Sequence, residues 1–432
     1  MSRTLYSLLW LCLLPLAVLR LLWRSRREPA YRLHMAERLG MSARAIGSPV
    51  IWIHAVSVGE TRAAQPLIEA LQRQRPDAVI LLSQTTAAGR GVAETLFDGR
   101  VMLAWLPWDL PWAQRAFLRR WQPELGIVLE TEIWPNLLHE AARAGIPVVL
   151  ANARLSARSA RGYARLGGFI RHAVSTFAQV IAQTDADAVR LRALGARQVT
   201  VAGNLKFDMA PPASQTRQGS DWRASLARRA VVLLASTRDG EETMLLDALL
   251  PVLPAEVLIA LVPRHPDRFD EVAALVRARG ISMCRRGAGE MPAAGTRLWL
   301  GDSMGEMSAW YALADIALIG GSWLPLGGQN LIEACAVGCP VIVGPHTFNF
   351  QQVTADAVAA GAALRARDTA EAAAQAVRLL GDAQRRAAMG EAGRTFSAAH
   401  RGATARTMAA IEPLLRRSSE GAISAPGPRP RS

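Results

Sequence analysis

The sequence alternates short apolar runs with polar, glycine-rich segments, and the pattern is clearest around residue 330. The run Ala314–Ile319 predicts a buried strand, and the segment 320–328 that follows holds two Gly-Gly pairs. A helical pattern starts near Asn330, Gly338 ends it, and Pro340–Val343 predicts the next buried strand. Strand, glycine loop, helix and strand in this order favour a doubly wound parallel sheet with a ligand site at the carboxyl ends of its strands.

The same alternation runs through most of the chain, so we predict an α/β fold. With 432 residues, the chain exceeds one typical core and suggests two domains. We place them at 35–207 and 221–400, joined by a proline-rich linker at 208–220 and followed by a disordered tail at 417–432. The expected strands are Val50–Ile53, Ile80–Ser83, Met102–Leu106, Leu125–Leu129, Pro147–Leu150 and Val180–Ala182 in the first domain, and Val231–Ala235, Val257–Val262 and Leu298–Leu300 in the second.

The composition favours an anionic partner. The formal net charge is +14, and Lys206 is the one lysine among fifty basic residues. So strong a preference for arginine indicates a coding bias, which weakens a nucleic-acid interpretation. A lysine kept in such a chain suggests a place that needs a compact point charge, although chance survival explains it as well. The four cysteines form no CxxC pair, which favours reduced thiols and a cytoplasmic domain.

The N-terminus, residues 1–27, predicts a single membrane anchor. Leu5–Trp23 is apolar except for Ser7 and Arg20, and about 19 residues are just enough to cross a bilayer. Several arginines follow it, so the positive-inside rule predicts that the body of the protein is cytoplasmic. No small-residue cleavage site follows, which disfavours a secreted signal peptide. A helix lying in the membrane interface remains the alternative.

In the first domain, polar loops follow three expected strands. Glu60 comes at the start of a helix, where a carboxylate is stabilised and can accept a proton from a hydroxyl; an ordinary first-turn glutamate is the simpler interpretation. Glu130 and Glu132 share a loop, where they are either used together or exposed to water. His54 at a strand end is more consistent with a structural role. The Asp185-Ala-Asp187 pair precedes a helix and predicts an N-cap more than a metal site.

In the second domain, the loops after the strands have the residue types of an anion and sugar site. Asn330 and Glu333 lie three apart on one side of a helix turn, where an amide and a carboxylate suit sugar hydroxyls; a capped turn is the alternative. Arg264 can meet a phosphate, or simply cap a strand at the surface. The sequence has neither GxGxxG after its first strand nor a GxxxxGK[ST] loop, which argues against a dinucleotide oxidoreductase and a P-loop ATPase.

Eight motifs in order carry a family resemblance. They are HAVSVGE (54–60), ETEIWPN (130–136), NARLS (152–156), GNLKFD (203–208), AST with GEE (235–242), PRHPDRF (263–269), GDSMGEM (301–307) and GGSWLPLGGQNLIE (320–333). Together they resemble the 3-deoxy-D-manno-octulosonic acid (Kdo) transferases of lipopolysaccharide synthesis. The resemblance implies a GT-B fold, with two Rossmann-like domains facing across a cleft. It also implies inverting transfer of Kdo from CMP-Kdo to a lipid A precursor, lipid IVA, without metal or other cofactor.

The resemblance also assigns roles to residues. Glu60 matches the family's general base, and Glu130 and Lys206 match groups that stabilise the transition state. The residues implied in CMP-sugar binding are Pro263, Arg264, His265, Met304, Gly305, Glu306, Gly327, Gly328, Asn330, Leu331, Ile332 and Glu333; Ser57, Gly59, Glu132 and Asn136 are expected on the acceptor side.

One departure is visible: Gln329 stands where the family usually has histidine, so a histidine role there does not carry over. The implied setting is the bacterial inner membrane, with anionic lipids as partners and the catalytic domains in the cytoplasm. Two alternatives remain: a GT-B enzyme that uses a UDP-sugar, and a membrane-tethered nucleotide-binding module without catalysis.

Overall fold

The computed structural model describes residues 2–26, 28–41, 48–209, 211–227 and 229–423, and the chain forms two compact units. Unit 1 combines residues 1–209 with 401–432, and unit 2 comprises residues 210–400. Within the described residues, each unit has a parallel sheet of seven strands. The predicted α/β class is therefore confirmed.

The sheet of unit 1 has the order β3-β2-β1-β4-β5-β6-β7. Side chains of β1 alternate: Val50 and Trp52 pack on one face, Ile51 and Ile53 on the other, as a sheet covered by helices on both sides requires. The edge strand β7, with exposed residues, was missed because it has no apolar run. The strands are β1 (Val50–His54), β2 (Val79–Gln84), β3 (Met102–Trp105), β4 (Leu125–Leu129), β5 (Val148–Ala153), β6 (Gln179–Ala182) and β7 (Val199–Val201).

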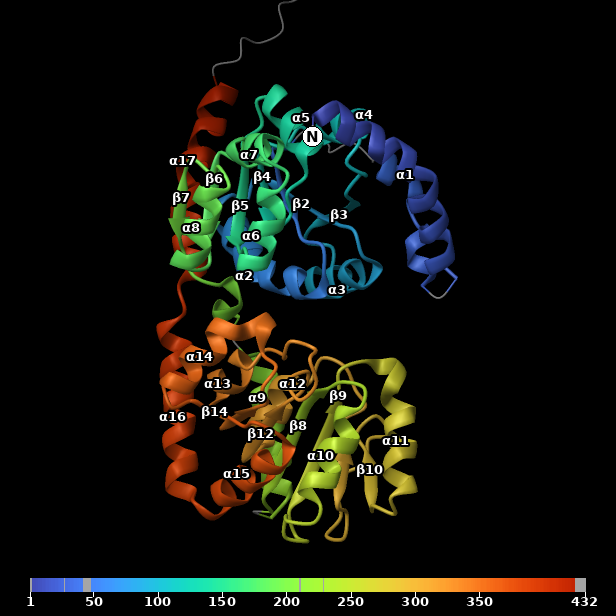
Figure 1. Cartoon of the computed structure of the whole chain (residues 1–432), viewed down its shortest axis with the longest axis vertical. Helices are drawn as coiled ribbons and strands as arrows, with labels where there is room; N and C mark the ends of the chain where they lie inside the picture. Colours follow the sequence, from blue (N-terminus) through green and yellow to red (C-terminus); the bar gives the residue numbers. More distant parts are fainter. Residues whose placement is uncertain (1, 27, 42–47, 210, 228, 424–432) are drawn as a thin grey trace, which may run out of the picture. The chain divides into compact units, whose positions relative to one another are not determined.

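The helices of unit 1 cover both faces of this sheet (Figure 1). One face packs against α4 (Pro111–Trp121), α5 (Pro135–Arg143), α7 (Gly168–Ser175) and α8 (Asp185–Ala193). The other packs against α2 (Val58–Gln74), α3 (Ala87–Phe97) and α17 (Ala403–Ile423). The remaining elements are α1 (Arg3–Arg24), η1 (Pro29–Arg32), η2 (Met35–Leu39), α6 (Ala157–Ala164) and η3 (Leu205–Asp208).

The sheet of unit 2 has the order β10-β11-β9-β8-β12-β13-β14. Its strands are β8 (Val231–Thr237), β9 (Leu258–Pro263), β10 (Met283–Arg285), β11 (Leu298–Leu300), β12 (Ile316–Ile319), β13 (Val341–Val343) and β14 (Ala363–Arg365). Its helices are α9 (Ala213–Ser225), α10 (Glu241–Leu249), η4 (Pro266–Arg268), α11 (Phe269–Ala278), α12 (Met307–Leu313), α13 (Ile332–Val337), η5 (Phe348–Phe350), α14 (Gln351–Ala359), α15 (Thr369–Gly381) and α16 (Ala383–Ala399). Helix α13 ends at Gly338, whose left-handed φ of 79° stops it as predicted.

The linker expected at 208–220 is not a linker. Residues from Ala213 onward form helix α9, which belongs to unit 2 and packs closely on α12. A Cβ on Gly219 would lie only 2.2 Å from the carbonyl oxygen of Ala309, so glycine is what permits this approach. Proline and small polar residues suggested an interdomain linker. Trp222 instead packs against Trp299 and Trp310 and so holds α9 on unit 2.

The first part of the segment expected to be a disordered tail, 417–423, is helical. Helix α17 returns to unit 1, where Ile411 and Leu415 are buried beside α2, and it continues to Ile423. The apolar positions of α17 find their partners in unit 1, which the local sequence does not reveal. The rest of the expected tail, 424–432, lies outside the described residues.

Candidate active site

The chain reverses its direction of winding in unit 1 between β1 and β4, which are neighbours in the sheet. Loops that follow such a pair diverge and leave a ligand site at the carboxyl ends of the strands. The segment after β1 contains Glu60, and the segment after β4 starts at Glu130. The fold therefore brings two of the expected catalytic carboxylates to one sheet edge.

Glu60 is held by a capping box at the start of α2. Ser57 is the N-cap, and its Oγ accepts the amide N–H of Glu60 at 3.3 Å. In return, the Glu60 carboxylate accepts the Val56 amide at 2.7 Å and the Ser57 hydroxyl at 3.1 Å. A capping box fixes a side chain at the first turn, so the structural and catalytic interpretations of Glu60 are compatible.

The pKa of Glu60 is raised from its ordinary value to about 7. Burial is the main cause, the negative charge of Glu130 is the next, and the hydrogen bond from Val56 opposes both. Glu132 contributes a smaller increase. A carboxyl with a pKa near 7 is poised to exchange a proton with a hydroxyl at neutral pH.

Glu130 forms an ion pair with the chain's single lysine. Nζ of Lys206 lies 2.8 Å from Oε1 of Glu130, and both side chains are partly buried. Lys206 stands in η3, whose N-cap is Asn204, and the backbone of Leu205 is tied to Asn152 by a 3.1 Å hydrogen bond. Glu130 has a φ of 58°, an unusual conformation for a non-glycine residue that concentrates at functional sites.

The expected acceptor-side residues have different surroundings. Ser57 caps α2. The space beside Gly59 is open, since a Cβ on this residue would meet only Ser57 Oγ, at 3.9 Å. Glu132 accepts the indole N–H of Trp134 at 2.8 Å, and burial raises its pKa. Asn136 is fully buried at the start of α5, where its side-chain amide donates to the Asp109 carbonyl oxygen at 2.7 Å and its Oδ1 accepts the Ser7 hydroxyl at 3.2 Å. Its acceptor-side role stays a prediction.

In unit 2 the corresponding reversal lies at β8, which has β9 on one side and β12 on the other. The buried carboxylate of Glu241, in the first turn of α10, joins the loops after β8 and β12. It accepts the amides of Gly321 at 2.6 Å, Trp323 at 3.0 Å and Arg238 at 2.9 Å. This anchor fixes the start of the glycine loop.

The glycine loop is tightly built. A Cβ on Gly320 would lie 2.3 Å from the carbonyl oxygen of Ser236, and a Cβ on Gly327 would lie 2.1 Å from Nδ2 of Asn349. Gly327 and Gly328 also have φ of 94° and 81°, which disfavour other residues. Each glycine is therefore required by the backbone path.

The loop leads into α13, whose N-cap Leu331 and first residue Ile332 are both buried. Oδ1 of Asn330 accepts the amide of Ile332 at 3.0 Å, and Nδ2 of Asn330 lies 3.4 Å from Oε1 of Glu333. These contacts match the capped turn that was one interpretation of the pair. They also place an amide and a carboxylate together at the helix start.

Arg264 and His265 follow β9, after the buried Pro263. Burial raises the pKa of the Tyr311 hydroxyl; the negative charge of Glu333 adds to this and Arg264 opposes it. Arg264 and Glu333 therefore both lie close enough to Tyr311 for their charges to affect its pKa. The pKa of His265 is lowered by burial and by the neighbouring Arg238 and Arg264, which favours a neutral imidazole beside this cationic group.

The segment Met304–Glu306 is braced by the helix that was expected to be a linker. Gln215 donates to the carbonyl of Gly305 at 2.5 Å, and Gln218 donates to Glu306 at 2.9 Å. Glu306 also accepts two hydrogen bonds from Arg286 and one from Ser303. Burial by itself raises the pKa of Glu306, but these hydrogen bonds outweigh it and lower the pKa.

Two other candidates have structural roles. His54 is fully buried, with Nδ1 2.9 Å from the Ser83 hydroxyl, and burial lowers its pKa to about 4. Asp187 lies in the first turn of α8, where it accepts the Leu155 amide at 2.9 Å and the hydroxyl of Thr184, the N-cap. Both agree with the structural interpretations made from the sequence.

Sequence reasoning missed Glu241, Gln215 and Gln218. The pair Gly240-Glu241, directly after a strand and at the start of a helix, was the available signal for Glu241. The two glutamines had none, because they lie in a segment without an apolar pattern. Among the described residues, no group of three His, Cys, Asp or Glu side chains could hold a metal ion.

Comparisons with known proteins decide the family. A model of the 3-deoxy-D-manno-octulosonic-acid transferase family matches residues 33–209, and a model of group 1 glycosyl transferases matches residues 293–396. The 3-deoxy-D-manno-octulosonic acid transferase of Bordetella pertussis is 47% identical over 431 residues, which cover 96% of this chain and all of that protein. The chain belongs to the Kdo transferase family.

Comparison with solved structures shows which known folds this Kdo transferase resembles. A glycosyltransferase from Rickettsia africae aligns with 86% of the chain and 99% of its own, at a TM-score of 0.60 and 10% identity. The C-terminal CMP-Kdo binding domain of WaaA from Acinetobacter baumannii is 32% identical over 97% of its length and 42% of this chain, with a TM-score of 0.41. Two doubly wound units and the glycosyltransferase likeness confirm the predicted GT-B type.

Proposed function

We propose that this Kdo transferase moves Kdo from CMP-Kdo to the lipid A precursor lipid IVA, with Glu60 as general base. The observation that carries the proposal is the raised pKa of Glu60, about 7, at the carboxyl edge of the unit 1 sheet. The capping box orients this carboxylate, and the charge of Glu130 increases its affinity for a proton. These are the properties that a hydroxyl-activating base needs at neutral pH.

The proposed reaction is a displacement at the anomeric carbon. The acceptor hydroxyl gives its proton to the Glu60 carboxylate, and its oxygen forms the new bond to the anomeric carbon of Kdo. The bond from that carbon to the phosphate oxygen of CMP breaks, and its electron pair leaves with CMP. Attack opposite the leaving group inverts the configuration, and the protein groups named here serve the step without a metal ion.

Lys206 and Arg264 supply the positive charge that this chemistry requires. Negative charge grows on the phosphate of CMP as the bond breaks, and fixed cations stabilise such charge strongly where water is excluded. The ion pair with Glu130 holds Lys206 in place. Arg264 shares its sheet edge with Glu333 and Tyr311.

We assign donor binding to unit 2. Its glycine loop, fixed by Glu241, brings backbone close to a ligand, and Asn330 with Glu333 offers partners for sugar hydroxyls. The Met304–Glu306 segment, braced by α9, presents backbone groups that suit a nucleobase. We propose that this base is the cytosine of CMP-Kdo.

We assign the protein to the cytoplasmic face of the bacterial inner membrane. Helix α1 is the one helix in the described part of the chain that is long and apolar enough to cross a membrane, with a mean hydropathy of 2.1 over its most apolar 18 residues. A net charge of +14 favours attraction to anionic lipids and to a phosphorylated acceptor.

Incubation of the full-length protein with CMP-Kdo and tetra-acylated lipid A precursor tests the proposal, with product mass as the readout. A mass increase of one or more Kdo units is expected, and release of CMP should match it. Replacing CMP-Kdo with UDP-sugars is the control. Transfer from a UDP-sugar alone would replace the proposal with the second GT-B interpretation. Nucleotide binding without any product would favour the non-catalytic module.

A further inference from the structure

Helix α1 is attached to unit 1 at both of its ends. Its first turns lie beside α5 (Figure 1), and its last turns contact η1, with Leu21 in an apolar cluster of unit 1. Twenty-two residues at about 1.5 Å each make a helix of roughly 33 Å, close to the thickness of a bilayer's hydrocarbon core. If the helix crossed a bilayer, its two ends would lie on opposite sides of the membrane.

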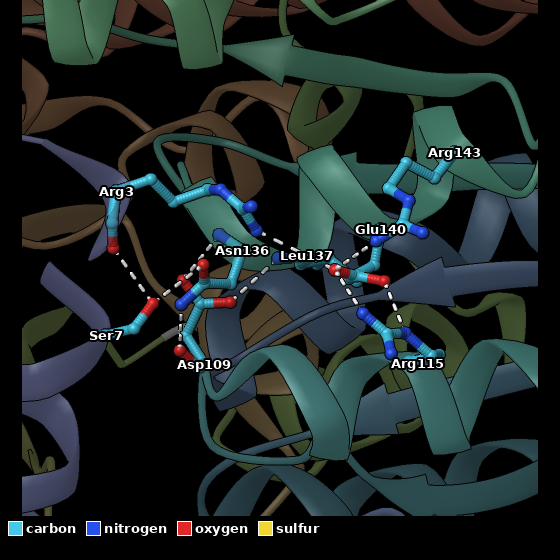
Figure 2. A network of polar contacts seen from close by, with 8 residues as sticks. All are labelled: Arg3, Ser7, Asp109, Arg115, Asn136, Leu137, Glu140 and Arg143. Atoms are coloured by element: carbon cyan, nitrogen blue, oxygen red, sulfur yellow. Dashed lines mark hydrogen bonds and ion pairs between the residues drawn. The ribbon is translucent and has the colours of Figure 1, made fainter.

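The first turns make specific polar contacts with unit 1. The Tyr6 hydroxyl donates to Oδ2 of Asp109 at 3.0 Å. Figure 2 shows the neighbouring contacts: the Ser7 hydroxyl donates to Oδ1 of Asn136 at 3.2 Å, and the Arg3 guanidinium lies 3.7 Å from Glu140. Arg3, Tyr6 and Ser7 all lie in the first turns of α1, so together they form one polar end of the helix.

The groups that receive these contacts belong to the folded body of unit 1. Asp109 is fully buried and also accepts the amides of Asn136 and Leu137, at 3.0 and 2.9 Å. Glu140 is buried and bonds to Arg115 at 2.8 Å. A first turn placed outside the membrane would leave the partner atoms of Asp109 and Asn136 without these donors.

The last turns pack on a different part of unit 1. Leu21 is buried in an apolar cluster with Tyr31, Ala87 and Trp105. Directly after the helix, Ser25 is buried and accepts a hydrogen bond from Arg32 at 2.7 Å. The helix is therefore held at two places, near Asp109 and near Trp105.

Between these two attachments, the helix presents an apolar face outward. The residues toward unit 1 repeat at helical spacing and include its polar side chains Arg3, Tyr6, Ser7 and the indole of Trp10, which donates to Tyr6. The opposite side consists of exposed leucines ending in Trp23, which is 60% exposed. These residues are Leu5, Leu8, Leu9, Leu11, Leu13, Leu16, Leu19, Leu22 and Trp23.

We propose that α1 lies in the plane of the membrane, with its leucine face in lipid and both ends attached to unit 1, and does not span the bilayer. The occupant of this face is the bilayer and not a second copy of the chain, because the face is continuous over the helix and has Trp23, Arg20 and Arg24 near its C-terminal end. Aromatic and arginine side chains favour the boundary between lipid headgroups and acyl chains.

This inference rests on the membrane location in the proposed function, and the experiment separates the two. The full-length protein with Cys12→Ser carries one added cysteine, either Ser2→Cys at the start of α1 or Val189→Cys, which replaces a 62% exposed residue of unit 1. An impermeant maleimide is applied to spheroplasts and to inverted inner-membrane vesicles. Sedimentation of the protein with the vesicles establishes membrane location independently.

Labelling of both cysteines in inverted vesicles, and of neither in intact spheroplasts, is expected. Labelling of Ser2→Cys in intact spheroplasts, with Val189→Cys protected, would overturn the in-plane helix while leaving the membrane location intact. Protein that stays soluble would overturn the membrane location as well.

Crosslinking in the membrane gives a second test. Arg3 and His139 line the same small cavity in unit 1, so Arg3→Cys with His139→Cys should be joined by a short bis-methanethiosulfonate reagent in vesicles. Arg3→Cys with Val189→Cys is the control pair and should remain separate. Loss of the first crosslink in vesicles, with its presence in detergent, would mean that the helix leaves unit 1 in a bilayer. Dimers formed through the leucine face would instead indicate a second copy as its occupant.

Discussion

Nζ of Lys206 lies 2.8 Å from Oε1 of Glu130, although 76 residues separate them in the chain. Lys206 is delivered by η3 and Glu130 by the end of β4, and the pair is partly buried. In the proposed function, this cation offsets the negative charge that develops on the phosphate of CMP. Its positive charge also reduces the repulsion between the carboxylates at this edge of the sheet.

Replacement of Lys206 by methionine should lower the transfer rate by about 100- to 1,000-fold, because a preorganised charge is lost from the transition state. The stability change should stay within about 1 kcal/mol, since the pair is partly solvent-exposed. Initial rates and thermal unfolding measure the two effects. Lys206→Arg, which keeps the charge, is the control and should lose less activity; an unchanged rate in Lys206→Met would remove the residue from the mechanism.

Replacement of Glu60 by glutamine should lower the rate by about 100- to 10,000-fold and leave CMP affinity unchanged. Glutamine can still accept the Val56 amide at this position, so the capping box is largely kept while proton acceptance is lost. Ser57→Ala is the matched control, because it weakens the cap and should cost about 1 kcal/mol of stability with a much smaller loss of rate. Equal losses of rate in both variants would indicate that Glu60 acts only as a cap.

The pH profile of transfer should fall on the acid side with an apparent pKa near 7, since Glu60 must be ionised to accept a proton. Stability has the opposite sign. The pKa of this group is higher in the folded state than in the unfolded chain, so its ionisation destabilises the fold as the pH rises from about 4.5 to about 7. Glu60→Gln should therefore gain unfolding free energy relative to wild type across that range. Parallel pH curves for the two proteins would contradict the shifted pKa.

Replacement of Glu241 by glutamine should weaken CMP binding at least tenfold and destabilise unit 2. The buried carboxylate accepts amides from Gly321, Trp323 and Arg238, and a glutamine side chain presents an N–H group to at least one of them. Hydrogen bonds to charged groups contribute roughly 1.5–3 kcal/mol each. Calorimetric titration with CMP and thermal unfolding measure the effects. Asp239→Asn, at an 86% exposed side chain, should change neither.

Replacement of Gly320 by alanine should abolish measurable CMP binding or unfold unit 2, because the added Cβ would lie 2.3 Å from the Ser236 carbonyl oxygen. Gly295→Ala is the control, since its Cβ would meet no atom within 4 Å. Circular dichroism first establishes whether the variant folds, and CMP titration follows. A folded Gly320→Ala protein with normal affinity would show that the loop adjusts its path.

Much of the fold was readable from the sequence because parallel strands buried on both faces are continuous apolar runs. Leu125–Leu129 and Leu298–Leu300 were predicted at their observed bounds for this reason. The edge strands β7, β10 and β14 were not predicted, since each has three residues and lacks a fully buried run. Helix α9 was mistaken for a linker because its packing rests on Trp222, the close approach at Gly219 and polar contacts of Gln215 and Gln218, which form no apolar pattern in the sequence.

The sequence by itself determined the family, the α/β class and the order of the loops, since motifs and apolar runs are local patterns. Only the tertiary structure decided which loops meet. It paired Lys206 with Glu130, buried Glu60 so that its pKa is raised, and placed the Asn136 side chain between Asp109 and Ser7 of α1. Ion pairs, desolvation and the attachment of a helix depend on distances between residues far apart in the chain, and those distances exist only after the sheets have formed.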